Sequence, residues 1–363
     1  MRLHPGVQAR VDGFSVSVPT VYDVAERAGV SIATVSRVYR NPDAVRAQTR
    51  DRVLGAARDL GYVPSGSARG LASRSTGVLG LCFPDYADPE AENAQDDDVE
   101  AMLYSDEIIR GMERAARRHG YALLIAASLS GGPEGLVAKV AGLVDGFAVL
   151  AGTVPAEDLE VISRRMPVVM LAGPREIDHF DHIEVANFDG QAELTRHLVK
   201  DHGLTRLAFV GGMADSPDAE ARFQGYRAAC REAGLPVPSL PDVRGKLTQT
   251  EGRLAVERLL ERGGRPPQAM LFANDQMAVG GLHALERLGL RVPDDVVVTG
   301  FDGIPLGRTI RPALTTVRQP MRRLGEEAVE LLLKRLRTPD RAPESVILPV
   351  TLARRASCGC NVA

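Results

Sequence analysis

Apolar residues near the start of the chain recur at the three- and four-residue spacing of an amphipathic helix. The first such face comprises Val21, Val24, Ala25 and Ala28. Gly29 then interrupts the helical pattern, and Ser31 has the side chain to cap a second helix. A third helical face lies within 47–60. The pattern predicts a module of three short helices over 20–62.

From residue 78 onward, short apolar runs alternate with amphipathic helical stretches. The apolar runs include 78–83, 121–127, 146–152, 167–173, 206–212, 269–275 and 296–303. Strands that are apolar at every position are buried on both faces, and in alternation with helices they build a parallel, doubly wound sheet. The series breaks near residue 175, which predicts two α/β lobes with a ligand crevice at the carboxyl ends of the strands.

Length and local composition give expected boundaries. At 363 residues, with 44% apolar and 25% charged residues, the chain has the size and balance of several globular domains. We expect a disordered leader over 1–19, a helical headpiece over 20–64, a hinge helix or linker over 65–76, a first lobe over 77–175 and 319–348, a second lobe over 176–318 and 349–357, and a tail over 358–363.

Composition excludes several classes of protein. No apolar run reaches the roughly 18 residues needed to cross a bilayer, and the leader lacks the apolar core of a signal peptide. We therefore expect a cytoplasmic protein without a membrane partner. Charge is unevenly distributed, since 1–75 holds 11 Arg and no Lys against six acidic residues, whereas the remainder has more acidic than basic residues. A basic module on an acidic body suggests that the N-terminus meets phosphates.

The helix, glycine turn and second helix of 20–37 form the pattern of a DNA-binding helix-turn-helix, whose second helix enters the major groove. It is followed by the blocks ARGL at 68–71, VDGF at 144–147, ARFQGY at 221–226, ANDQMAVG at 273–280, GFDG at 300–303 and LTTVRQP at 314–320. In this order, over roughly 20–357, the chain resembles the LacI/GalR family of bacterial transcription regulators. The resemblance implies a hinge helix, a core like a periplasmic sugar-binding protein, a homodimer on an operator, and a small-molecule effector.

The resemblance also implies which residues contact DNA. Base preference would be set by Ile32, Ala33 and Thr34 at the start of the recognition helix. Arg37 can bridge O6 and N7 of a guanine, and its alternative role is a phosphate contact or a surface ion pair. Contacts to the DNA backbone are expected from Tyr22, Ser31, Ser36, Arg40, Thr49 and Tyr62.

Leu71 in the ARGL block is the expected minor-groove wedge. In this family, the equivalent leucines of two subunits enter the minor groove at the centre of the operator, and such a wedge kinks the duplex. The alternative is that Leu71 packs against its own hinge helix. Because both hinges must meet, the operator should be a near-palindrome.

Polar residues in the later blocks match effector-contacting positions of the family. They are Asp189, Arg222, Asn274 and Asp302, with Phe83 and Tyr104 as possible walls of the cleft or as core residues. Carboxylates and a guanidinium suit a polyol such as a sugar. The segment 242–252 lacks the aromatic platform of many family members, with Leu247 about where it would lie. The alternative effector is therefore a nucleobase or another non-sugar metabolite that acts as a corepressor. Asp275 is expected to cap the next helix.

Other functions find less support in the sequence. A transporter's solute-binding protein would have two lobes, but neither the helix-turn-helix nor the absent signal peptide fits it. An enzyme is not expected, because no nucleophile elbow, P-loop, HExxH or dinucleotide motif is present. Neither a cofactor nor a metal site is expected. Cys358 and Cys360 are taken as free thiols in a loose tail, since no nearby His or Cys offers further ligands.

Overall fold

The computed structural model describes residues 19–63, 75–84, 94–128, 140–173, 179–261, 263 and 265–360. It divides into two compact units, Met1–Thr76 and Gly77–Ala363, and each is described by itself. The predicted leader up to residue 18, Leu71 and most of the predicted hinge lie outside the described residues.

The first unit contains the predicted helices, α1 (Val21–Ala28), α2 (Ile32–Arg40) and α3 (Ala47–Leu60), with a short 3-10 helix at Pro42–Ala44. Gly29 and Gly61 take the left-handed conformation and end α1 and α3 as predicted. The Oγ of Ser31 accepts a hydrogen bond from the Thr34 amide and so caps α2. One apolar side chain from each helix is completely buried at the centre of this unit, namely Val24, Val35 and Val53.

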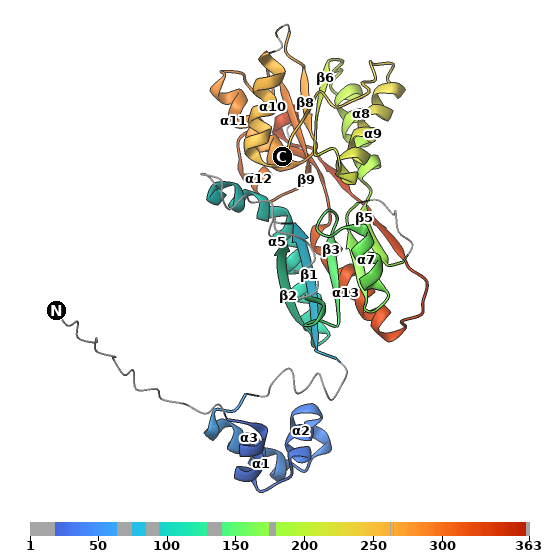
Figure 1. Cartoon of the computed structure of the whole chain (residues 1–363). Coiled ribbons are helices and arrows are strands. Elements are labelled where there is room, and N and C mark those ends of the chain that lie inside the picture. Colours follow the sequence, from blue (N-terminus) through green and yellow to red (C-terminus); the bar gives the residue numbers. More distant parts are fainter. Residues whose placement is uncertain are drawn as a thin grey trace, which may run out of the picture. The chain divides into compact units, whose positions relative to one another are not determined.

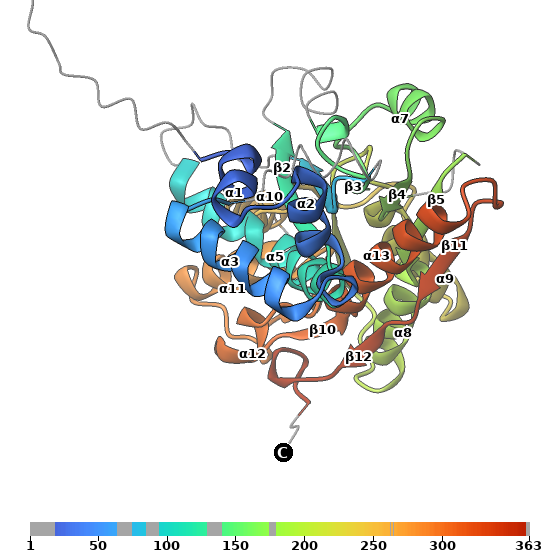
Figure 2. The same ribbon diagram turned by 90° about the horizontal axis from the view of Figure 1, so that it is seen from below.

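The second unit contains two α/β lobes (Figure 1). The first lobe has a sheet of six parallel strands in the order β11-β5-β4-β3-β1-β2. Its elements are β1 (Val78–Pro84), α5 (Ala94–Arg118), β2 (Ala122–Ser128), β3 (Gly146–Leu150), α7 (Ala156–Ser163), β4 (Val168–Leu171), β5 (Asp181–Val185), α13 (Met321–Arg337) and β11 (Ser345–Leu348). Helices α5 and α13 pack side by side (Figure 2).

The second lobe repeats the arrangement in the order β12-β10-β9-β8-β6-β7. Its elements are α8 (Asn187–Lys200), β6 (Leu207–Gly211), α9 (Pro217–Glu232), β7 (Val243–Arg244), α10 (Gln249–Glu261), β8 (Ala269–Phe272), α11 (Asp275–Arg287), β9 (Val297–Asp302), α12 (Leu306–Thr309), β10 (Thr315–Arg318), β12 (Thr351–Ala353) and a final 3-10 helix at Ala356–Cys358. Only β12, at the edge, runs antiparallel to its neighbour within this sheet. The predicted fold, a helical headpiece followed by two parallel α/β lobes, is confirmed.

The boundary between the lobes lies later than residue 175. Strand β5 pairs with β4 and β11, so it belongs to the first lobe, and the chain enters the second lobe only at α8. The strand begins with Asp181 and His182, which a hydropathy pattern does not read as buried. Asp181 is nevertheless fully buried, because Arg335 (3.0 Å) and Arg341 (2.5 Å) pair with its carboxylate.

The chain crosses between the lobes after β5, after β10 and after β11. Because the carboxyl ends of the parallel strands face this junction, a pocket between the lobes is bordered by strand ends from both sheets. Among the described residues, no helix is both long and apolar enough to cross a membrane.

Candidate functional site

The predicted base-reading residues lie on the exposed side of α2. Ile32, Ala33 and Arg37 are exposed, whereas Val35 and Val38 face the core of the first unit. Thr34 is half-buried, and its hydroxyl is 2.9 Å from that of Ser31. The recognition helix therefore presents an apolar N-terminal turn with a single hydroxyl pair, followed one turn later by a guanidinium.

Tyr22 of α1 and Ile32 of α2 are large side chains that the core of the first unit does not cover. Tyr22 is 67% exposed and Ile32 is 39% exposed. Ser36, Thr49 and Tyr62 of the predicted backbone-contact set are partly exposed. Arg40 ends α2, and the Leu71 prediction lies outside the described residues. The described members of the predicted DNA-contacting set thus all lie on the first unit.

The second unit contains a cavity of about 380 Å³ between its two lobes. Its first-lobe wall follows the ends of β3 and β4 with Leu150–Gly152, Ala172 and Gly173, and includes Tyr104 on α5. Its second-lobe wall is formed by Met213, Asp215–Ala219, Arg222, Lys246–Thr248, Asn274, Gln276 and Asp302. A cavity of this size accepts a small molecule such as a monosaccharide or a nucleobase. Of the predicted effector residues, Tyr104, Arg222, Asn274 and Asp302 line this cavity.

Arg222 is the central polar group of the cavity. It is buried on α9, where its Nε donates to Asn187 Oδ1 (2.8 Å) and its Nη1 donates to the Ala273 carbonyl (2.5 Å). Its guanidinium lies 3.9 Å above the centroid of the Phe301 ring and 3.3 Å from a carboxylate oxygen of Asp302. These contacts fix the plane of the guanidinium, and within the described part of the chain its Nη2 group makes no hydrogen bond. The arrangement therefore leaves donors for a ligand in a fixed orientation.

Asp302, which lines the cavity, and Asp275, which does not, form a buried pair of carboxyl groups. Burial raises the pKa of Asp302, and the neighbouring Arg222 works in the opposite direction. Burial also raises the pKa of Asp275, and the charge of Asp302 adds to this effect. Gln319 Nε2 donates to Asp302 at 2.6 Å. A ligand hydroxyl that donates to Asp302 would stabilise its charged form, so hydrogen-bond donors are favoured at this position.

The roles of Asn274 and Asp275 differ from the prediction. Asn274, not Asp275, caps α11, since its Oδ1 accepts from the Met277 amide (3.0 Å), while its Nδ2 donates to the Leu247 carbonyl. Asp275 accepts hydrogen bonds from the amides of Gly303 and Ile304. It also accepts one from the Thr316 hydroxyl (2.6 Å). Asp275 therefore joins the start of α11 to the end of β9 and to β10 rather than capping a helix.

Two predicted effector residues lie away from the cavity. Asp189 is exposed on α8, and Phe83 packs in the hydrophobic core of the first lobe. Asn187, two positions before Asp189, instead contacts Arg222. Successive helical residues are about 100° apart, so positions 187 and 189 face nearly opposite sides of α8. The prediction had the correct helix but the wrong face.

Backbone strain is concentrated around the cavity. Among the described residues other than glycine, positive φ occurs at Ala172 (61°), Leu247 (69°) and Asp302 (121°), and all of them line the cavity. Such conformations persist where surrounding structure enforces them, and they cluster at ligand sites. Gln276 also lines the cavity, and its buried Nε2 lacks a hydrogen-bond partner within the described structure. Leu247 lines the cavity at the position where many family members are expected to have an aromatic residue.

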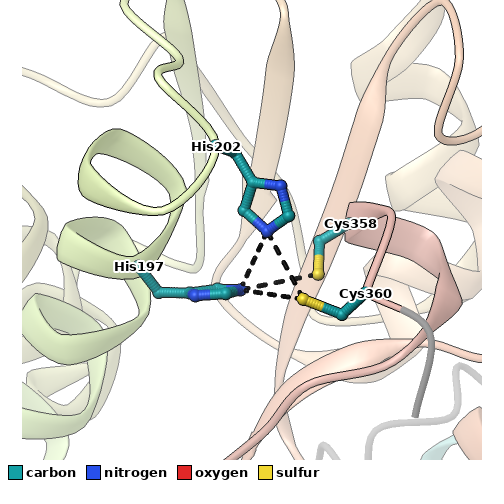
Figure 3. A group of neighbouring side chains, drawn as sticks. All are labelled: His197, His202, Cys358 and Cys360. Carbon is teal, nitrogen blue, oxygen red and sulfur yellow. Dashed lines mark hydrogen bonds between the residues drawn. The ribbon is translucent and has the colours of Figure 1, made fainter.

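The cysteines near the C-terminus are not part of a loose tail. Cys358 is buried in the final 3-10 helix, and Cys360 is half-buried beside it. His197 and His202 lie against both thiols, so the expectation that no histidine is near them is wrong (Figure 3). The spacing His197-x4-His202 at the end of a predicted helix is the sequence signal that could have identified this cluster.

Comparisons with known proteins agree with this architecture. The model of bacterial regulatory proteins of the lacI family matches residues 20–65, and that of the periplasmic binding protein-like domain matches 195–358. The catabolite control protein A of Priestia megaterium is 33% identical over 343 residues, which cover 93% of this chain and 98% of the relative. The ribose operon repressor of Escherichia coli (strain K12) is also 33% identical and covers 93% of this chain and 99% of the relative.

Solved structures extend the likeness to both units. The Lac repressor dimer bound to operator and the anti-inducer ONPF has a TM-score of 0.80 at 27% identity, covering 94% of this chain and 99% of that chain. The complex of the transcriptional regulator CelR with cellobiose has a TM-score of 0.69 at 30% identity, covering 93% and 99% of the two chains. The named relatives are transcription regulators rather than enzymes.

Proposed function

Because the chain belongs to the LacI family of bacterial transcription regulators, we propose that it represses transcription as a homodimer bound to a near-palindromic operator. A small polar effector in the cavity between the lobes would control its affinity for that operator. Membership of the family supports a DNA-binding repressor that responds to an effector. We propose in addition that the protein is a homodimer, that its operator is symmetric and that its effector is small and polar.

The exposed side of α2 carries the proposal for DNA. Exposure of the apolar Ile32 side chain to water is unfavourable, whereas in the major groove the side chain can contact a thymine methyl group. Thr34 and Arg37 supply hydrogen bonds to base edges, and Tyr22, Ser31, Ser36, Arg40, Thr49 and Tyr62 supply backbone contacts. A wedge at Leu71 stays a prediction from the family resemblance.

The geometry of the cavity supports a hydroxylated effector. Fixed donors on Arg222, an acceptor on Asp302 and the Nε2 group of Gln276, which lacks a partner within the described structure, suit a sugar or polyol. Names of relatives agree, since they include a ribose operon repressor and a regulator complexed with cellobiose. A nucleobase acting as corepressor is the second candidate. The 242–252 segment of the wall contains no aromatic residue, so it offers no ring on which either a sugar or a base could stack.

Effector binding can be transmitted because the cavity is shared by both lobes. The Gly173 amide of the first lobe donates to Asp218 Oδ1 of the second lobe at 3.0 Å, and both residues line the cavity. A ligand that binds one inter-lobe angle more tightly shifts the population towards that angle. The change in the angle between the lobes would then alter the affinity for the operator through the segment that joins the two units.

The test is selection of operator sequences by the full-length chain from a randomised double-stranded DNA library. We expect enrichment of an inverted repeat. The variant Arg37→Ala should relax preference at one base pair in each half-site, because a bidentate guanine contact contributes about 1–3 kcal/mol of discrimination.

The control variant is Arg58→Ala, which removes an equally exposed arginine from α3 and should leave the selected sequence unchanged. A library that shows no enrichment, or an enriched site without dyad symmetry, would contradict the proposal. Identical preferences for wild type and Arg37→Ala would remove Arg37 from the base-reading set.

A further inference from the structure

A second group of convergent polar side chains lies in the second lobe, and none of them lines the cavity. We propose that His197, His202, Cys358 and Cys360 form a tetrahedral binding site for zinc or a similar divalent cation. The inference is independent of the proposed DNA-binding function, because it concerns a different set of residues and a different ligand.

The distances between the donor atoms match those around a tetrahedral zinc ion. Nε2 of His197 lies 3.2 Å from Nε2 of His202 and 3.6 Å from each sulfur atom, and Nε2 of His202 lies 3.4 Å from Sγ of Cys360. Bond lengths of about 2.0–2.1 Å to nitrogen and about 2.3 Å to sulfur place tetrahedral corners about 3.3–3.8 Å apart. All four donor atoms lie within 4.8 Å of one another, so an ion requires only small adjustments.

The histidine side of the cluster is oriented for metal binding. His197 lies in the last turn of α8, and Nδ1 of its ring is 2.7 Å from a carboxylate oxygen of Asp201. A carboxylate that accepts the Nδ1 proton leaves the lone pair of Nε2 directed at the cluster, and this second contact is typical of zinc-bound histidine. Figure 3 shows both imidazoles presenting nitrogen atoms to the two sulfur atoms.

The cysteine side is held in place by the fold rather than by the cluster. Ser357, next to Cys358, is fully buried, and its Oγ donates to the Val298 carbonyl (2.6 Å) and accepts from the Thr315 amide (2.8 Å). These contacts anchor the final 3-10 helix to β9 and β10. The backbone therefore holds Cys358 beside the histidines, so binding of an ion costs little conformational entropy at this residue.

Charge and softness of the donor set favour zinc. Two thiolates and two neutral imidazoles around a divalent ion give a site with no net charge, which suits a location that is half-buried or buried at every donor. A set of two sulfur and two nitrogen donors in tetrahedral geometry is typical of zinc, whereas magnesium and calcium require oxygen. Bound zinc would link α8 to the end of the chain across more than 150 residues of sequence.

The first measurement is the zinc content of the full-length chain, purified without a polyhistidine tag. We expect about one zinc per chain in the wild type and a loss of most of it in Cys360→Ser/His202→Asn, which replaces the two less buried donors. The matched control is Cys82→Ala/His283→Asn, which removes the same kinds of side chain elsewhere in the second unit and should retain the zinc.

The second measurement replaces zinc with cobalt(II). Wild-type protein should show the intense visible bands of tetrahedral cobalt and a thiolate charge-transfer band, and His202→Asn alone should alter the spectrum if the double variant does not fold. Removal of the metal should lower the Tm of the wild type by several degrees and leave the double variant unchanged. Equal zinc in both double variants, weak octahedral cobalt bands, or a disulfide between Cys358 and Cys360 in the purified protein would overturn the proposal.

Discussion

A buried polar cluster lies at each end of helix α8, but the two clusters differ in what their donor groups face. At the N-terminal end, Asn187 holds Arg222 in the wall of the cavity. At the C-terminal end, His197 lies against His202 and the thiols, about 15 Å along the axis from Asn187. The first cluster retains donors that face open volume, whereas the donors of the second face one another.

This difference separates a site for an exchangeable ligand from a site for a resident ion. A cavity of about 380 Å³ with strained walls has room for a small molecule. Four donors within 4.8 Å leave room for a single atom. One helix therefore connects a site suited to a variable signal with a site suited to a fixed cross-link, and variants at the two ends should affect separate measurements.

The largest effect is expected at the cavity end, from Arg222→Met. The change keeps an unbranched apolar side chain but removes the guanidinium that lies over Phe301 and leaves the buried Asp302 without its cation, which costs roughly 3–5 kcal/mol of the free energy of unfolding. Burial already raises the pKa of Asp302, so the folded state of the variant binds a proton more readily than the unfolded chain. Its stability should therefore be highest in acid and fall as pH rises through the raised pKa. Urea unfolding at several pH values measures this.

Two further variants complete that test. Arg222→Met/Asp302→Asn should recover much of the stability, because the carboxylate that lost its partner is also removed. Arg227→Met, on the same helix, should have a small effect, since Arg227 is only partly buried. In a thermal-shift screen of sugars, polyols and nucleobases, a compound that stabilises wild type should fail to stabilise either Arg222 variant, whereas the zinc content should remain. Ligand stabilisation that survives in Arg222→Met would exclude Arg222 from the effector site.

The contrast also shows what the sequence could predict. Buried parallel strands are apolar at every position, so the α/β alternation was visible. The family motifs identified Arg222, which lies within α9, Asn274, which caps α11, and Asp302, which ends β9. Strand β5 was not predicted because its first residues are polar, and the carboxylate of Asp181 is buried only in partnership with arginines from α13 and the segment after it. The His/Cys cluster was not predicted, because its histidines lie at the end of α8 and just after it, whereas its cysteines lie near residue 360. Only the folded lobe brings the two pairs together.

A smaller effect is expected from Gly225→Ala, which acts on the contact between α8 and α9. A Cβ at this position would lie 2.2 Å from the Phe188 carbonyl oxygen, so α8 must move away. Overpacking of this kind costs about 1–3 kcal/mol, and the movement should separate Asn187 from Arg222 and weaken effector binding. The cluster end should retain its zinc, because its donors and Ser357 anchor are untouched.

The same substitution at Gly55, in the middle of α3, is the control, because no atom lies within 4 Å of its added Cβ. There it should stabilise the helix by about 0.5–1 kcal/mol, since alanine is the better helix former. Comparison of denaturation curves and ligand affinities for the two variants separates crowding from helix propensity. If Gly225→Ala weakened zinc binding as much as effector binding, the two ends of α8 would not be independent.

Asp201→Asn should have the smallest effect on the free energy of unfolding, but it should selectively weaken metal binding at the His/Cys cluster. Asp201 is about half exposed and lies beside His197, so its loss removes no core contact. Asparagine can still accept the Nδ1 proton, but without a full negative charge it makes the imidazole a weaker donor to the metal, which typically lowers metal affinity 10–100-fold. Competition with a chromophoric chelator measures this affinity. Glu232→Gln, which removes an exposed carboxylate paired with Arg196 on α8, should leave the affinity unchanged. If Asp201→Asn and Glu232→Gln bound zinc equally well, the carboxylate at His197 would be a surface contact rather than part of the metal site.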